Sequence, residues 1–325
     1  MNFIKHMARL REFMILCIVI GVILTMSFAS PHFLTSRNLI ALMLGLSIET
    51  IIAVGMTNLM VSGGFDMSVG SITAFIGAAT AMMVTFDIPV FSAVILGLCI
   101  GAFIGMLNGL VVAKLGINAF VTTLSSLSLF RGLTLIVSGG RNISGLPESF
   151  EVIGQSSLLG IQMPIWYAVF LVIAGDMMLR KARFFRQNYY IGGNEKAARL
   201  SGISVDKIKI INYVLTGLFA GFAGIVMTSR LGSASMTAGI GLELRVITAV
   251  IIGGASLGGG EGTVIGTFLG SVLMALIVNA LTLFGVDVYW QTFVIGGTLL
   301  IAVVIDRLGK IRREKKNLAS GRGIK

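Results

Sequence analysis

The chain alternates between long apolar stretches and short polar or glycine-containing connections. An α-helix needs about 20 apolar residues to cross the bilayer core, and most of the stretches approach that length. They cover residues 13–29, 39–61, 69–86, 89–113, 117–137, 165–179, 210–229, 246–257, 263–284 and 288–305. The eighth stretch is short and ends in glycines. The pattern therefore predicts an all-α fold, a polytopic transmembrane helical bundle of about ten spans.

The composition leaves no room for a separate soluble domain. Hydrophobic residues make up 55% of the 325, charged residues only 12%, and the mean hydropathy is +0.95. Soluble domains average about 25% charged residues and have no means of hiding this much apolar surface. We therefore expect residues 1–325 to form a single transmembrane domain.

Nothing in the chain is typical of an enzyme or a metal site. Cys17 and Cys99 lie far apart within apolar stretches, which favours buried thiols over a disulfide or a metal site. His6 and His32 are the only histidines. The glycine run 258–262 lacks the lysine of an ATP-binding phosphate loop. We expect no catalytic residue, no metal ligand and no cofactor on this chain.

The distribution of basic residues predicts the orientation in the membrane. A net charge of +11 would suit nucleic-acid binding, but basic residues concentrated in short connections are the mark of cytoplasmic loops. With a cytoplasmic N-terminus at 1–12, the inner connections also include 180–209 and a tail at 306–325. Together with Lys114, these segments hold all but five of the 25 lysines and arginines. We expect both termini in the cytoplasm, lipid around the spans and no nucleic-acid partner.

The largest external connection in this topology is residues 138–164. It is polar and carries Glu148 and Glu151. A docking surface for an external protein and a simple connector both fit such a loop.

A glycine-rich break separates the second and third stretches. Residues 62–71 read S-G-G-F-D-M-S-V-G-S, in which Asp66, Ser68 and Ser71 can cap the next helix. One interpretation is a tight turn with an N-cap. The other is an interrupted helix beside a translocation path, where transporters place broken helices and polar groups. The pattern alone leaves both open.

A second glycine-rich segment lies between the eighth and ninth stretches. Residues 253–263 read G-G-A-S-L-G-G-G-E-G-T, and the spacing of glycines and large apolar residues is similar to that of the first segment. An internal duplication and a chance likeness of two glycine-rich turns both explain the similarity.

The long inner connection contains a short helix with a marked start and stop. Asn194 can cap it, Glu195 suits its positive end, Arg199 its negative end, and Gly202 can terminate it. The small side chains of Ala197 and Ala198 make one side of this helix narrow enough to fit into a cleft of a partner protein. A surface helix that only satisfies topology is the alternative.

Taken together, these segments resemble the permease subunits of bacterial ribose-type (monosaccharide) ABC importers. The resemblance runs from about the first span to the last. The matching stretches are I-I-A-V-G-M-T at 51–57, G-G-F-D-M-S-V-G-S at 63–71, T-L-x-x-L-S-L-F-R-G at 123–132, G-G-N-E-K-A-A-R-L-S-G-I at 192–203 and G-G-A-S-L-G-G-G-E-G-T-V-I-G-T at 253–267. Several motifs in the same order make the resemblance specific.

The resemblance implies an inner-membrane subunit that works with three kinds of partner. Two permease subunits, identical or different, would form the pathway, and ABC ATPase subunits carrying ATP and Mg²⁺ would dock in the cytoplasm. A substrate-binding protein would deliver a sugar-like solute outside. The family's coupling segment maps onto 193–202 here, which selects Gly193, Asn194, Glu195, Ala197, Ala198, Arg199 and Gly202.

One position departs from the family. Ribose-type permeases tend to carry a neutral residue before I-I-A-V-G-M-T, whereas this chain has Glu49. An acid deep in a span is costly and faces a cavity or a partner, for which Arg131 is a candidate. A pair that fixes helix packing and a solute contact remain equal alternatives, and the sugar stays open. The full set of candidate pathway residues is Glu49, Asn58, Asp66, Ser68, Asn108, Arg131 and Asn279.

Three other functions remain to be tested against this one. Glu49 and Asp66 could serve as ion carriers in a secondary transporter driven by an ion gradient. An ABC permease for branched-chain amino acids or nucleosides shares the architecture. A purely structural membrane scaffold is the third alternative, although the Asn and Gly content of the spans argues against it.

Overall fold

A computed structural model describes residues 2–319 and is almost entirely helical. The helices are α1 (Asn2–Ala29), α2 (Ser36–Val61), α3 (Val69–Thr85), α4 (Val90–Ala113), α5 (Ala119–Ser138), α6 (Glu148–Gln155), α7 (Met163–Lys181), α8 (Arg183–Gly193), α9 (Glu195–Leu200), α10 (Val205–Leu231), α11 (Leu242–Ile252), α12 (Val264–Leu283) and α13 (Val288–Ala319). The last residues of the predicted tail, 320–325, lie outside the described part. The predicted helical bundle is confirmed.

Eight helices of the described chain are long and apolar enough to cross a membrane: α1, α2, α4, α5, α7, α10, α12 and α13. They coincide with eight of the predicted stretches. The outer faces of these helices carry exposed large apolar side chains, including Phe13, Phe91 and Phe293. Such surfaces suit lipid and would be unstable in water.

The eighth predicted stretch needs correction. Residues 246–257 were expected to be helical throughout, but α11 ends at Ile252 and is followed by turns. Gly253 packs directly against the α12 backbone at Gly266 and Thr267, and Gly254 has a φ of +95°. At 1.5 Å per residue, the 11 residues of α11 rise only about 16 Å, roughly half of the bilayer core.

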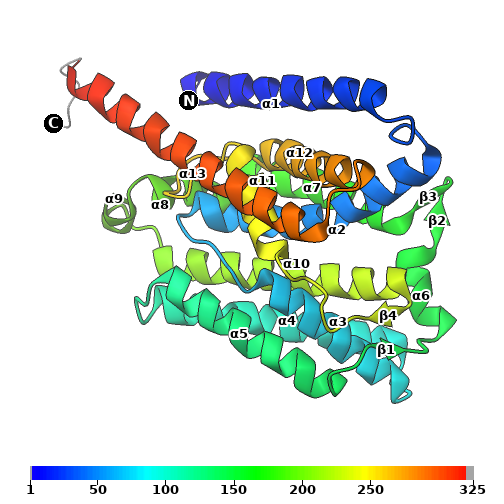
Figure 1. The fold of residues 1–325 in the computed structure, drawn as a ribbon. Coiled ribbons are helices and arrows are strands. Elements are labelled where there is room, and N and C mark those ends of the chain that lie inside the picture. Colours follow the sequence, from blue (N-terminus) through cyan, green and yellow to red (C-terminus); the bar gives the residue numbers. More distant parts are fainter. Residues whose placement is uncertain (1, 320–325) are drawn as a thin grey trace.

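Short strands join connections at one end of the bundle. β1 (Ile143–Ser144) pairs antiparallel with β4 (Ser233–Ala234), and β2 (Ser157–Leu158) pairs with β3 (Ile161–Gln162). In Figure 1 these strands and α6 lie at the right, whereas α8, α9, the start of α1 and the end of α13 lie toward the left. The connection 138–164 and the connection 180–209 therefore lie at opposite ends.

α10 is the central helix, and its contact with α4 is built from glycines. Gly97, Gly101, Gly105 and Gly109 recur every fourth residue of α4 and are buried. A Cβ on Gly101 would lie 2.8 Å from the Gly217 carbonyl oxygen of α10. Small residues at this spacing let two helix backbones approach closely, which is a common basis of helix packing in membranes.

We expect Gly105→Val to destabilise the bundle by about 2–3 kcal/mol, because a core without space cannot accept added atoms. A Cβ at Gly105 would overlap the Tyr213 carbonyl oxygen and lie 3.0 Å from Val214 Cα. Thermal unfolding in detergent measures the change. Gly21→Val, in a span with open space around this glycine, is the control, and equal melting temperatures for both variants would contradict the packing described.

Two helices begin inside the bundle instead of at its ends. α3 starts part-way along α10, where Thr73 Oγ1 donates to the Ala220 carbonyl at 3.1 Å. α11 starts nearby, since a Cβ on Gly70 would overlap the Gly239 carbonyl oxygen and the Glu243 carboxylate. Figure 1 shows the chain entering the bundle before each of these helices. Of the two interpretations of 62–71, this arrangement favours the interrupted helix.

Candidate translocation pathway and coupling segment

Three predicted pathway residues meet at the start of α3. Asp66 is fully buried, and its Oδ1 accepts hydrogen bonds from the Ser68 amide at 2.7 Å and the Ser68 hydroxyl at 2.5 Å. Asn108 of α4 donates from Nδ2 to Ser68 Oγ at 3.1 Å and to Asp66 Oδ2 at 3.4 Å. The capping prediction is wrong for all three residues. Ser68 is the N-cap of α3 but makes no side-chain cap hydrogen bond, Asp66 accepts only from the Ser68 amide just before the helix, and the Ser71 hydroxyl donates to the Ser68 carbonyl at 2.8 Å.

This polar cluster opens toward a groove between α4 and α5. The Asn108 Oδ1 accepts a hydrogen bond from the Ser126 hydroxyl at 2.5 Å. The groove has a volume of about 440 Å³, and Asn108, Thr122, Ser125 and Ser126 contribute polar groups to a largely apolar wall. Sequence reasoning missed Ser126, although the serines of S-L-S-L at 126–129 were visible within the fifth stretch.

The predicted partner of Glu49 is wrong. Glu49 of α2 pairs with Arg245 of α11, whose Nε lies 3.0 Å from Glu49 Oε1. Arg131 instead donates from Nη1 to the Ala238 carbonyl at 2.7 Å, in the segment that leads into α11. The reason is topological, because α11 packs against α2 and brings Arg245 to it from 196 positions away in sequence.

Glu243 completes a group of four charges around the start of α11, and sequence reasoning did not select it. Its carboxylate interacts electrostatically with Arg131 and Arg245. Both Glu243 Oε2 and Glu49 Oε2 are buried without a hydrogen-bond partner. Two arginines and two glutamates from α2, α5 and α11 thus gather around the start of α11. The signal for Glu243 was available, since L-E-L-R at 242–245 places two opposite charges at the edge of an apolar stretch.

The two remaining predicted pathway residues lie apart from this group. Asn58 is buried in α2, donates from Nδ2 to the Val54 carbonyl at 3.1 Å, and leaves its Oδ1 without a partner. Asn279 of α12 exchanges hydrogen bonds of 3.2 and 2.7 Å with Asn38 at the start of α2. Asn279 therefore ties two helices together at the end of the bundle opposite to α9.

The short helix α9 has the start and stop that the sequence predicts. Asn194 is the N-cap, and its side chain accepts from the Ala197 amide at 3.0 Å. Gly202, with a φ of +79°, follows the helix in the left-handed conformation that glycine adopts most readily. Ala198 is buried, whereas Ala197 faces solvent.

Charged side chains connect α9 to the start of α10. Glu195 accepts from Lys209 at 2.6 Å and from Arg199 at 3.0 Å, and Arg199 also reaches Asp206 at 2.5 Å. Partial burial acts to raise the pKa of the Glu195 carboxyl, but the hydrogen bonds and charges of Lys209 and Arg199 outweigh it and hold this pKa below its ordinary value. Glu195 is therefore ionised at neutral pH. These ion pairs attach α9 to the first turns of the central helix α10.

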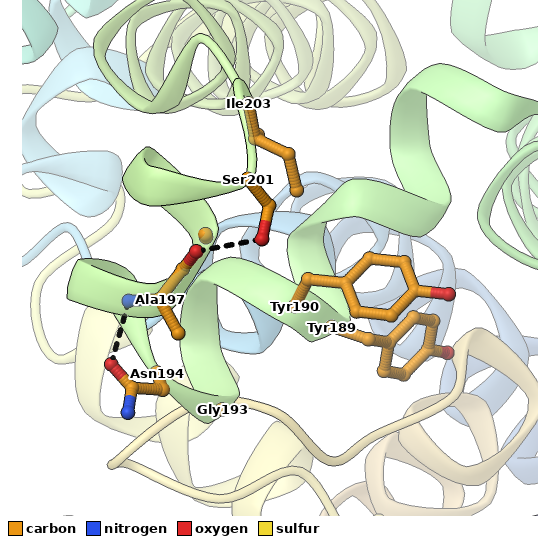
Figure 2. Close-up of a pocket in the computed structure, with 8 residues that line it drawn as sticks. Tyr189, Tyr190, Gly193, Asn194, Ala197, Ser201 and Ile203 are labelled. Carbon is orange, nitrogen blue, oxygen red and sulfur yellow. Dashed lines mark hydrogen bonds between the residues drawn. The ribbon is translucent and has the colours of Figure 1, made fainter.

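A cleft lies beside α9 at the end of the bundle (Figure 2). Its volume is about 470 Å³, and it is lined by Tyr189, Tyr190, Gly193, Asn194, Ala197, Ala198, Ser201 and Ile203. Of the lining residues Tyr190 is 60% exposed, and the neighbouring Leu200 is 91% exposed. These two side chains give the cleft an exposed apolar edge. Leu200 was not selected from the sequence, although a single leucine at the end of the charged helix E-K-A-A-R-L is visible there.

Comparisons with known proteins agree with this architecture. The chain matches the protein family described as "Branched-chain amino acid transport system / permease component" over residues 38–303. It is 40% identical to the ribose import permease protein of Escherichia coli, over 90% of this chain and 91% of the relative. It is 41% identical to the ribose import permease protein of Bacillus subtilis, over 88% and 89% of the two chains. It is 36% identical to the L-arabinose ABC transporter permease protein of Azospirillum brasilense, over 89% and 85%.

The fold thus defines a multi-pass helical protein of the bacterial inner membrane. The chain belongs to the branched-chain amino acid transport system / permease component family. It is a transport subunit and not an enzyme, and the family resemblance drawn from its motifs is confirmed. No solved structure matches the chain.

Proposed function

We propose that this chain is the membrane-spanning permease subunit of an ABC importer that moves a monosaccharide into the cytoplasm. The observation that carries the proposal is the match to ribose and L-arabinose permeases over some nine-tenths of the chain. The geometry supports it, because a capped, ion-paired helix beside an apolar cleft is suited to receive a partner subunit. ATP and Mg²⁺ would be held by that separate ATPase.

The proposed topology has ten crossings with both termini in the cytoplasm. Eight are the long helices, and the other two are interrupted crossings. One combines the segment 62–68 with α3, and the other combines the segment 232–241 with α11. This count puts α9, the start of α1 and the end of α13 on one side, in agreement with their common position in Figure 1. The segment 138–164 then faces outward and is the proposed docking surface for a substrate-binding protein.

The pathway would run beside the interrupted helices. Asp66, Ser68 and Asn108 offer hydrogen bonds there, and the groove between α4 and α5 gives access to them. A second permease subunit, identical or different, would cover this groove. Amide and hydroxyl groups along the pathway would form weak, transient hydrogen bonds with the hydroxyls of a sugar. Tight binding would be the role of the external substrate-binding protein.

Purification in mild detergent tests the proposal. We expect an ABC ATPase to co-purify with the chain, and uptake in proteoliposomes to require ATP and the binding protein. Radiolabelled pentoses and hexoses, branched-chain amino acids and nucleosides would identify the solute. Uptake that persists without any ATPase and collapses with an uncoupler would instead establish an ion-gradient-driven transporter.

A further inference from the structure

The glycine-rich loop 253–263 is bonded to several helices at the end of the bundle that carries α9. Its backbone accepts from Arg11 of α1 at the Gly254 carbonyl, at 3.1 Å, and Ser256 donates to Asp306 of α13 at 2.8 Å. Glu261 pairs with Arg11 at 2.7 Å. The loop thus contacts α1 and α13, and it also contacts α2, α8 and the segment that follows α2.

The contact with α2 and α8 is made by backbone atoms without side chains between them. The Gly260 amide donates to the Val61 carbonyl at the end of α2, at 2.9 Å. A Cβ on Gly259 would lie 2.7 Å from Gly192 Cα and 2.9 Å from Gly63 Cα. The two glycine-rich segments therefore meet at Gly192, one residue before the predicted coupling segment. Three backbones in direct contact cannot move independently, because no flexible side chain separates them.

Tyr189 adds a side-chain link between α8 and this loop. Its hydroxyl donates to the Gly262 carbonyl at 2.8 Å. Burial raises the pKa of Tyr189 to about 12, so the phenol keeps its proton at physiological pH and remains a donor. Tyr189 also lines the cleft beside α9 (Figure 2), and thus touches both the proposed docking site and the loop.

The loop in turn leads to the interrupted helix α11. A backbone hydrogen bond closes the loop, since the Ser256 amide donates to the Glu261 carbonyl at 3.2 Å. α11 precedes the loop directly, and its other end holds Glu243 and Arg245 beside Gly70 and Glu49. A shift of α8 therefore has a short rigid route to the start of α11.

We propose that Tyr189 and the glycine contact around Gly192 position the loop 253–263 so that it moves with α8, and that this loop carries the motion of the coupling segment to α11. Tyr189 is a positioning residue, since it would act on the pathway through the loop. The inference rests on the proposed importer function and names a route within it.

Tyr189→Phe tests the inference, because it removes one oxygen atom and keeps the ring. Tyr167→Phe is the matched control. The Tyr167 hydroxyl also donates to a backbone carbonyl, that of Ile153 at 3.1 Å, but at the opposite end of the bundle. In proteoliposomes with the ATPase and binding protein, we expect Tyr189→Phe to retain ATP hydrolysis while radiolabelled ribose uptake per ATP falls about fivefold, the change expected for one lost hydrogen bond. Tyr167→Phe should match the wild type.

A second measurement does not depend on transport. In the purified chain, we expect backbone hydrogen exchange in 258–263 to be about fivefold faster in Tyr189→Phe than in Tyr167→Phe. Unchanged exchange, or unchanged uptake per ATP, would overturn the inference while leaving the importer function intact. If no ATPase co-purifies with the wild-type chain, the proposed function itself fails, and the coupling route falls with it.

Discussion

Glu195→Lys is expected to lower ATP-driven uptake about 100-fold or more while the protein still inserts and folds. The substitution places a third positive charge beside Arg199 and Lys209, which both bind the native carboxylate. Like charges at such distances repel, so α9 loses its attachment to α10. Folding should survive, because exposed ion pairs contribute only about 0–1 kcal/mol each. Uptake and ATPase co-purification, measured in parallel, separate lost docking from lost transmission.

Lys207→Glu is the matched control for this substitution. Lys207 is exposed on the first turn of α10, close to Asp206, and has no ion pair in the described structure. Reversing its charge alters the same end of the bundle without touching the links between α9 and α10. Equal uptake in the Glu195→Lys and wild-type proteins would refute the coupling role of α9. Equal loss in both variants would mean that net charge, and not the ion pairs, matters.

Local features of this chain could be predicted from sequence because short-range chemistry determines them. The ends of α9 follow from Asn194 and Gly202, whose cap and left-handed turn involve only neighbouring residues. Eight spans follow from length and hydropathy alone. The end of α11 could not be predicted in this way, because it depends on the packing of α11 against α12. Gly253 lies against the α12 backbone, and nothing in the local pattern reports which helix lies opposite.

Among the polar sites, too, contacts between sequence neighbours could be predicted and contacts between distant helices could not. Asp66 and Ser68 are neighbours in sequence, and their association was visible. The addition of Ser126 through Asn108 required knowledge that α5 lies beside α4. The partner of Glu49 was missed because a charge within a span can be paired from any adjacent helix, and periodicity does not order helices in space. Arg131 was the nearer choice in sequence, but Arg245 is the partner in the structure.

The Glu49–Arg245 pair gives the second large expected effect. Glu49 is 9% exposed and Arg245 29% exposed as side chains, so removing one charge leaves the other buried without compensation. We expect Arg245→Met to lower the free energy of unfolding by about 3–5 kcal/mol. Thermal unfolding in detergent and the amount of folded protein in membranes measure the loss. Arg37→Met, at an exposed arginine in the first turn of α2, should change neither.

The double variant Glu49→Gln/Arg245→Met decides what the pair does. Once both charges are gone, the desolvation penalty disappears, and we expect most of the stability lost in Arg245→Met to return. If uptake returns with it, the pair serves helix packing and holds the start of α11 in place. If stability returns while uptake remains lost, the charges act on the solute path. A double variant no more stable than Arg245→Met would contradict the pairing, because removing the Glu49 charge would then relieve no penalty.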